Sequence, residues 1–245
     1  MKHGGYSVSP VGVHGTTDPY GHDGLKTLGY EICEQLDGNA PDWIFGPVGA
    51  AGSNIWGAWH GAKEFNELGF VSTLPHMVAC QPAAAAPLVK AVQEKLDYVP
   101  YVQIQPTNIA KAVDATSSYK GLRAVRDSKG DAVAVKDDEA WEMERALALT
   151  EGISAGSASA MPLVAAKKLR EEGRIDRDEV IVCTLSSHGQ KETDRSIDYR
   201  TFMGGGGGQL PEKSLVSYDS IVFKAEPTWE NFAAFVEKRY GLNLL

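Results

Sequence analysis

Residues 43–53 read Trp-Ile-Phe-Gly-Pro-Val-Gly-Ala-Ala-Gly-Ser, a pattern typical of a strand that turns into a helix. The apolar run up to Val48 predicts a buried strand, and the small residues after it predict a tight turn. Apolar residues then recur at helical spacing as far as Gly69, at Ile55, Trp59, Ala62, Phe65 and Leu68. The stretch therefore predicts a strand, a glycine-rich turn and an amphipathic helix in succession.

Strands and helices alternate on both sides of this stretch. Further strands are predicted at residues 5–10, 77–80, 132–135 and 180–185. A turn is predicted at residues 18–24, and helices or helical pieces at residues 25–36, 88–96, 108–113, 121–126, 137–150, 157–173 and 228–240. Apolar strands that alternate with helices predict an α/β fold, with a parallel sheet covered by helices on both faces. In such sheets, ligands bind at the carboxyl ends of the strands.

The overall charge limits the classes of partner. The chain of 245 residues has a net charge of -8. A negative surface repels phosphate backbones and anionic membranes, so nucleic-acid and membrane partners are not expected. The sequence has no apolar run of about 18 residues that would span a membrane. It also has no apolar signal-peptide core at its start, so we expect a cytoplasmic protein.

The cysteines and histidines give no sign of a metal or disulfide site. The three cysteines, Cys33, Cys80 and Cys183, form no CxxC pair. Their odd number and their spacing argue against a disulfide framework and against zinc. Cys80 and Cys183 lie in apolar runs, where we expect buried and unreactive thiols. The six histidines do not share metal-ligand spacing, so no metal site is predicted.

The glycine-rich turn offers a place for an anion, and we call its five residues the cradle: Gly49, Ala50, Ala51, Gly52 and Ser53. Their small side chains let the main chain approach a ligand closely. The start of the following helix adds free N–H groups and a positive dipole end, which suit a phosphate. The turn lacks both GxGxxG and the Lys-Ser/Thr of a P-loop, which disfavours a standard nucleotide site. The alternative interpretation is a tight turn whose small residues serve packing alone.

Further short motifs surround the cradle in a fixed order. They are Asp18-Pro19-Tyr20, Asp23-Gly24-Leu25-Lys26-Thr27, Glu31-Ile32, Pro47-Val48-Gly49, Gln81-Pro82, Ala134-Val135, Glu151-Gly152-Ile153, Val182-Cys183 and residues 185–191. Together they resemble the threonine synthases over residues 18–194. By this resemblance the chain is identified as a member of the pyridoxal-phosphate (PLP) enzymes of fold type II.

The resemblance carries implications for architecture and cofactor. It implies most of the α/β large domain of a fold type II enzyme in residues 1–203. The glycine-rich loop and helical tail that the sequence predicts in residues 204–245 have no counterpart in the family. The resemblance implies PLP as the cofactor, with the PLP phosphate in the cradle. Ser186 matches the position that faces the pyridine nitrogen, with Thr184 and Ser187 as alternatives if the match shifts by one or two residues. The implied activity is that of a lyase or synthase acting on an amino acid or its phosphorylated derivative.

The sequence also departs from the threonine synthases. The lysine that carries PLP in that family lies upstream of the matched region, so we assign no catalytic residue. We therefore expect the chain to be incomplete without an N-terminal segment. Lys26 is no substitute, since it matches a different lysine of the family. Residues 152–158, Gly-Ile-Ser-Ala-Gly-Ser-Ala, are more similar to the cysteine synthases. His188, after the last predicted strand, is a candidate proton carrier or an ordinary loop residue.

These departures leave three functions open. The first is a threonine synthase-like enzyme with a small amino-acid substrate, acting as a homodimer or paired with a missing N-terminal half. The second is a domain that binds PLP or phosphate without turnover. The third is a cysteine synthase-like enzyme that replaces a substituent on the β-carbon of its substrate. Whether the chain is an enzyme by itself is left open at this point.

Overall fold

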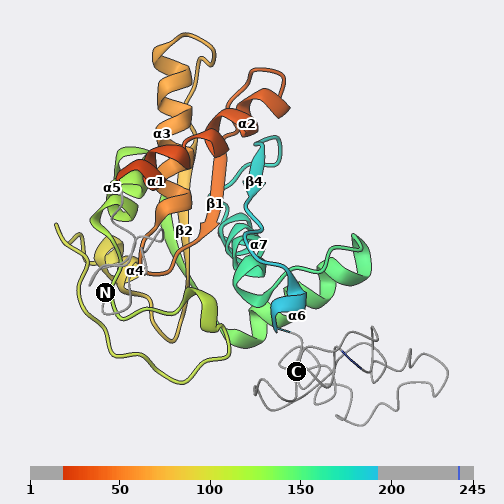
Figure 1. The fold of residues 1–245 in the computed structure, drawn as a ribbon. Helices are drawn as coiled ribbons and strands as arrows, with labels where there is room; N and C mark the ends of the chain where they lie inside the picture. The colour runs from red at the N-terminus through yellow and green to blue at the C-terminus, as the bar shows by residue number, and fades with distance from the viewer. Residues whose placement is uncertain (1–18, 193–236, 238–245) are drawn as a thin grey trace. The chain divides into compact units, whose positions relative to one another are not determined.

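The structure, a computed structural model, describes residues 19–192 and residue 237. Its sheet has four strands in the order β3-β2-β1-β4 (Figure 1). The strands are β1 (Trp43–Pro47), β2 (His76–Pro82), β3 (Asp131–Val135) and β4 (Ile181–Cys183). Each neighbouring pair runs parallel. The parallel sheet predicted from the sequence is therefore confirmed.

The central strand β1 sends its side chains alternately into two cores. Trp43 and Phe45 belong to one cluster of buried residues, and Ile44 and Val48 belong to another. Successive side chains of a strand point to opposite faces of a sheet, so both faces of this sheet are apolar. Both faces therefore need a cover of helices.

Helices cover both faces, as predicted. On one face α7 (Ser157–Glu171) packs on the strands, and α6 (Asp137–Thr150) packs on α7. On the other face lie α3 (Ser53–Glu67), α4 (Pro87–Gln93) and α5 (Tyr119–Asp127). There are two short turns of 3-10 helix. η1 (Ala110–Ala112) lies between α4 and α5 along the chain, and η2 (Gly189–Glu192) follows β4.

Glycines bring α2 (Thr27–Gln35) very close to α3. A Cβ atom added at Gly29 would lie 2.4 Å from the carbonyl oxygen of Ala58. One added at Gly61 would lie 2.1 Å from the carbonyl oxygen of Lys26. Any larger side chain would push the two helices apart. This packing also holds α1 (Pro19–Gly24), which precedes α2, against α3.

Three local predictions were wrong. Residues 18–24 were predicted as a turn, but α1 forms there, because a proline is as compatible with the first turn of a helix as with a turn. The apolar stripe of α3 does not extend to Leu68, which lies beyond the end of the helix and is 70% exposed. The strand predicted at residues 180–185 is shorter, and as an edge strand β4 leaves Ile181 37% exposed.

The acidic start of α6 makes contacts outside the helix. Asp137 is the first helical residue. Its carboxylate accepts hydrogen bonds from Thr107 Oγ1 and the Asn108 N–H, both at 2.6 Å. The Glu139 carboxylate accepts instead from the N–H of Lys136, at 2.9 Å. The acidic start of α6 therefore anchors the preceding loop as well as the helix.

Several predictions fall outside the described residues. They concern the strand at residues 5–10, the glycine run at residues 204–208, the helix at residues 228–240 apart from Glu237, and the domain boundary after residue 203. These stay predictions. Within residues 19–192, every helix is too short or too polar to cross a membrane.

Candidate functional site

The cradle lies where β1 ends and α3 begins. The backbone of Gly52 has φ +60°, in the left-handed region that favours glycine. A Cβ atom at Gly52 would also lie 3.0 Å from Cα of Gly121, at the start of α5. Both the conformation and the close approach therefore require glycine at this position.

The cradle presents main-chain donors that the protein itself does not use. Within residues 19–192, no group accepts a hydrogen bond from the N–H of Gly49, Ala50, Ala51 or Gly52. The first turn of α3 starts at the next residue and contributes the positive end of its dipole. The sequence from Trp43 to Lys63 contains no carboxylate that would repel an anion. This arrangement suits the binding of a phosphate group.

The carbonyl groups of the same loop are bonded to side chains. Ser117 Oγ donates to the carbonyl oxygen of Gly49 at 2.8 Å, and Ser118 Oγ donates to that of Ala51 at 2.5 Å. Gln81 Nε2 lies 3.4 Å from the carbonyl oxygen of Val48. Donors of the loop are thus left open while most of its acceptors are occupied.

Sequence reasoning missed Ser117 and Ser118. The available signal was a pair of hydroxyl residues just before a predicted helix. Ser118 is the N-cap of α5, where its Oγ accepts from the N–H of Gly121 at 3.4 Å. That signal explains the helix start, but it does not point to the cradle.

A buried histidine lies beside the first residue of α3. His22, on α1, is only 4% exposed, and its Nε2 lies 3.5 Å from Ser53 Oγ. The close packing of α2 on α3 holds α1 in this place. His22 was considered in the sequence only for metal spacing, so its proximity to the cradle was not predicted.

Ser186 lies at the same edge of the sheet as the cradle. Cys183 pairs with Phe45, so Ser186 and Val48 both lie three residues beyond this pair. A Cβ atom added at Gly46 would lie 3.1 Å from Thr184 Oγ1, which confirms that the two strand ends are adjacent. The Ser186 side chain is exposed at this edge.

The two alternatives to Ser186 have other contacts. Thr184 Oγ1 donates to the Phe45 carbonyl oxygen at 3.1 Å, which ties it to β1. Ser187 Oγ accepts from Lys111 Nζ at 3.4 Å. The Ser187 N–H donates to the buried Ser159 Oγ at 2.6 Å, which fixes this loop to the start of α7.

His188 is held in the loop that follows β4. Its Nδ1 accepts from the N–H of Gln190 at 3.1 Å, and its backbone forms an isolated bridge with Ala155. These contacts explain His188 as a loop residue, although its side chain is exposed at the same edge as Ser186. No catalytic assignment follows from them.

Lys26 is engaged in a small charged cluster. Its Nζ lies 3.1 Å from Glu64 Oε1 and 3.2 Å from Asp23 Oδ1. Hydrogen bonds to Glu64 and Asp23 raise the pKa of Lys26 above its ordinary value. A lysine held in its charged form is a poor nucleophile, and no catalytic role is assigned to Lys26.

Of the two strand cysteines, Cys80 is buried as predicted, whereas Cys183 is only partly buried because β4 is an edge strand. Cys80 is fully buried, and burial raises the pKa of its thiol well above the ordinary range. Burial likewise raises the pKa of Cys183 to about 12, although this residue is less completely enclosed. Thiols with such pKa values carry almost no thiolate at neutral pH and are unreactive. Within residues 19–192, no three His, Cys, Asp or Glu residues gather to hold a metal ion.

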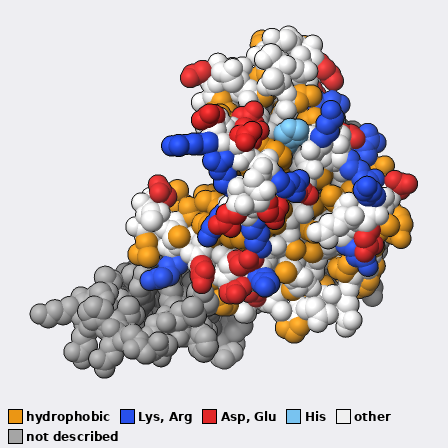
Figure 2. All heavy atoms as spheres, turned by 180° about the vertical axis from the view of Figure 1, so that it is seen from behind, with side chains coloured by type: hydrophobic (Ala, Val, Ile, Leu, Met, Phe, Trp, Pro, Cys, Tyr) orange, Lys and Arg blue, Asp and Glu red, His pale blue; other side chains and the backbone are white. Residues whose placement is uncertain are grey.

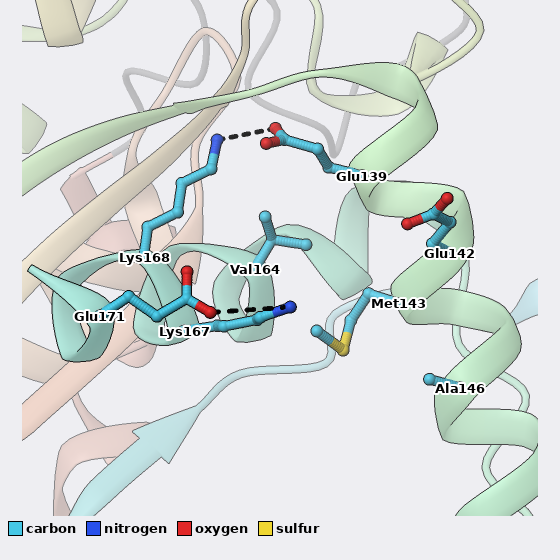
Figure 3. Close-up of a pocket in the computed structure, with 8 residues that line it drawn as sticks. All are labelled: Glu139, Glu142, Met143, Ala146, Val164, Lys167, Lys168 and Glu171. Atoms are coloured by element: carbon cyan, nitrogen blue, oxygen red, sulfur yellow. Dashed lines mark hydrogen bonds and ion pairs between the residues drawn. The ribbon is translucent and has the colours of Figure 1, made fainter.

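A groove lies between α6 and α7, on the face of the sheet opposite α3 (Figure 3). Its volume is about 350 Å³. Lys168 Nζ lies 2.7 Å from Glu139 Oε2, and Lys167 Nζ lies 3.8 Å from Glu171 Oε1. Both lysines in this groove are therefore already paired with carboxylates.

Figure 2 shows acidic and basic side chains intermixed on one face of the described residues. The cradle, whose open donors are main-chain N–H groups, suits a single small phosphate.

Comparison with known proteins identifies the family of the chain. The profile of the family described as "Pyridoxal-phosphate dependent enzyme" matches residues 3–187. Threonine synthase from Methanocaldococcus jannaschii is 42% identical over 184 residues, which are 74% of this chain and 45% of that enzyme. Threonine synthase from Methanosarcina acetivorans is 37% identical over 184 residues, again 74% of this chain and 45% of the enzyme. That from Mycobacterium bovis is 33% identical over 194 residues, 78% of this chain and 48% of the enzyme.

The chain thus spans slightly less than half the length of these curated relatives. The region matched by the family includes the cradle, β4 and Ser186. PLP is the cofactor of this family, in agreement with the prediction. A match over most of the chain, together with relatives above 30% identity, settles the membership. The chain belongs to the family of pyridoxal-phosphate dependent enzymes.

Proposed function

We propose that this chain binds PLP by its phosphate in the cradle and forms the cofactor-binding part of a threonine synthase-like enzyme. The observation that carries this proposal is the set of unused N–H groups from Gly49 to Gly52 at the positive end of α3. A phosphate dianion supplies acceptors for these groups and is stabilised by the helix dipole. The family membership identifies PLP as the ligand that carries such a phosphate.

The described residues fit the phosphate of PLP. The side chains at Ala50 and Ala51 are too small to block the main-chain donors. No carboxylate lies between Trp43 and Lys63, and the carbonyls of Gly49 and Ala51 are bonded to serine hydroxyls. Ser53 adds a hydroxyl at the first residue of α3. The cradle thus offers donors to an anion and keeps acceptors away from it.

The roles of the remaining groups follow from their position at this edge. When bound, PLP supplies an electron-withdrawing ring that stabilises negative charge on an amino-acid substrate. Ser186 is proposed to donate its hydroxyl to the pyridine nitrogen, since it lies at the same edge as the cradle and its side chain is exposed. A neutral hydroxyl partner keeps that nitrogen unprotonated and limits the electron withdrawal by the ring.

A second candidate function is binding of PLP without turnover. It is favoured by the state of Lys26, whose ammonium group is paired with the carboxylates of Asp23 and Glu64. The amino-acid substrate, its conversion to threonine, and the pairing of this chain with itself or with another segment belong to the first proposal. Conversion to cysteine belongs to the separate alternative of a cysteine synthase-like enzyme.

The test of cofactor binding compares PLP with pyridoxal, which lacks the phosphate. The full chain, freed of cofactor, is titrated with each compound by equilibrium dialysis. We expect PLP to bind on the order of 100-fold more tightly, because several charge-assisted hydrogen bonds depend on the phosphate. Equal affinities for the two compounds would contradict the proposed site.

The test of turnover follows on the loaded chain. Borohydride reduction and peptide mapping show whether a lysine of this chain carries PLP. Formation of threonine from the substrate of threonine synthases supports the first function, and formation of cysteine from O-acetylserine and sulfide supports a cysteine synthase-like enzyme. Binding without an adduct and without either product supports the second function. Light scattering of the same sample measures whether the chain forms a dimer.

A further inference from the structure

We infer that Ser117 and Ser118 are positioning residues for the phosphate site: their hydroxyls hold two cradle carbonyls so that the N–H groups of Ala50 and Gly52 face the phosphate. The inference rests on the proposed function, because it concerns how the cradle receives an anion. Neither serine is assigned to contact the cofactor.

The contacts that carry the inference join two distant segments of the chain. Ser117 is 8% exposed, and its Oγ donates to the carbonyl oxygen of Gly49 at 2.8 Å. Ser118 Oγ donates to the carbonyl oxygen of Ala51 at 2.5 Å. The start of α5 is pressed against the cradle at Gly52, where an added Cβ would lie 3.0 Å from Cα of Gly121. Two short hydrogen bonds and a close backbone contact therefore hold the cradle at alternate peptides.

The geometry of the peptide unit turns these contacts into an orientation of donors. The carbonyl of Gly49 and the N–H of Ala50 belong to one planar trans peptide, so they point in opposite directions. The same is true of the carbonyl of Ala51 and the N–H of Gly52. A carbonyl drawn toward Ser117 or Ser118 directs the next N–H away from α5. Neither N–H has an acceptor within residues 19–192.

The consequence for an anion exceeds the loss of one hydrogen bond within the protein. A cradle peptide that has lost its serine partner is free to rotate, and its carbonyl oxygen then faces the phosphate in place of the N–H. That rotation removes one donor and adds a repulsive acceptor at the same position. The small residues of the cradle, above all the glycines, offer little resistance to such a rotation.

The test removes each hydroxyl in the full chain. Ser117→Ala removes the donor to Gly49. Ser118→Gly removes the donor to the carbonyl oxygen of Ala51. Ser118 is the N-cap of α5, and glycine is also a favoured N-cap residue, so the helix start is kept. We expect the dissociation constant for PLP to rise about tenfold in each variant, while that for pyridoxal stays unchanged.

A matched control is available at the opposite edge of the sheet. Ser128 is 6% exposed, donates to the carbonyl oxygen of Val125 at 3.0 Å and accepts from the N–H of Met77 at 2.9 Å. Ser128→Ala therefore also removes a buried hydroxyl that bonds to the main chain. This variant is expected to be less stable than the wild type but to bind PLP as tightly.

Each outcome decides the inference separately from the proposed function. Serine variants that bind PLP as tightly as the wild type overturn the inference, and so does an equal loss of affinity for PLP and pyridoxal. If the wild type holds no PLP, the proposed function is wrong. The inference is then decided on the ligand-free chain by residual dipolar couplings of the Ala50 and Gly52 N–H vectors. The variant that carries both Ser117→Ala and Ser118→Gly is compared with the wild type. N–H vectors with unchanged directions overturn the inference, and rotated N–H vectors support it.

Discussion

The cradle and the groove between α6 and α7 both collect hydrogen-bonding groups, but they use them in opposite ways. In the groove, Lys167 and Lys168 are paired with carboxylates of the same two helices (Figure 3). In the cradle, the N–H groups from Gly49 to Gly52 have no acceptor within residues 19–192. The groove has the volume of a ligand pocket, about 350 Å³, yet its lysines are satisfied. Unmet donors, rather than volume or charged side chains, therefore distinguish the proposed phosphate site.

The paired groups of the groove serve the fold. Lys168 Nζ also donates to the carbonyl oxygen of Ala134 at 3.2 Å, so one ammonium joins α6, α7 and β3. Burial acts to raise the pKa of Glu139, but the hydrogen bonds from Lys168 and from the backbone of Lys136 outweigh it, and that pKa is lowered. The carboxylate is thus held ionised for its partner. Changes in the groove should affect stability, and changes in the cradle should affect cofactor binding.

The largest effect is expected from Gly52→Ala. The substitution forces an L-residue into the left-handed region at φ +60° and places a methyl group 3.0 Å from Cα of Gly121. The strain costs about 1–2 kcal/mol, and the displaced cradle no longer aims its donors at one point. We expect the dissociation constant for PLP to rise by at least about 100-fold, measured by equilibrium dialysis.

The control for this change is Gly69→Ala. Gly69 has φ +78°, and a Cβ atom there would meet nothing within 4 Å. The substitution introduces the same kind of backbone strain at the end of α3 that is remote from the cradle. It should lower the free energy of unfolding by about 1 kcal/mol and leave PLP affinity unchanged. A similar loss of PLP affinity in both variants would break the distinction between cradle and scaffold.

Lys168→Met is expected to have a smaller effect, on stability rather than on PLP binding. The substitution removes the ion pair with Glu139 and the hydrogen bond to Ala134, whereas the aliphatic part of the side chain is kept. Both partners of the ion pair are about 30% exposed, so we expect a loss of about 1 kcal/mol in urea unfolding. PLP affinity should not change. The double variant with Glu139→Gln should lose little more than the single one, because the two residues act as a pair.

The sequence predicted the elements whose signals are local. An apolar run identified β1, a run of small residues identified the cradle, and helical spacing identified α3. Burial at the sheet edge was not predictable, because Ile181 lies in an apolar run like a central strand and only the strand order leaves it exposed. The helix α1 was mistaken for a turn, since Pro19 is compatible with both.

The site was predictable in part for the same reason. The cradle residues are consecutive in the sequence, so their small side chains and the helix after them were visible together. The serines that hold its carbonyls were not, because 68 positions separate Ser117 from Gly49 and 67 separate Ser118 from Ala51. His22 likewise meets Ser53 across 31 positions, through the packing of helices at glycines. Contacts of this kind follow from tertiary structure and leave no pattern in the sequence.

The smallest effect concerns the cluster that fixes α1 and α2 to α3. Glu64 accepts hydrogen bonds from Tyr30 Oη and from Lys26 Nζ, and the bond from Tyr30 is the main cause of the lowered pKa of Glu64. A carboxyl with a lowered pKa in the folded state stabilises the fold above its ordinary pKa of about 4.3. That contribution is lost as the pH falls through the folded-state pKa. Glu64→Gln should therefore lower the free energy of unfolding at pH 7.

The size of this effect is limited because the Glu64 side chain is 35% exposed, and solvent screens the pair. We expect the free energy of unfolding to fall by less than about 1 kcal/mol at pH 7. This difference shrinks as the pH falls below the pKa of an ordinary glutamate. Urea unfolding of both chains across this pH range measures it. A difference that stays constant with pH would assign the loss to packing rather than to charge. PLP affinity at pH 7 should stay that of the wild type, since a satisfied cluster, like the groove, supports the fold without offering donors to the anion.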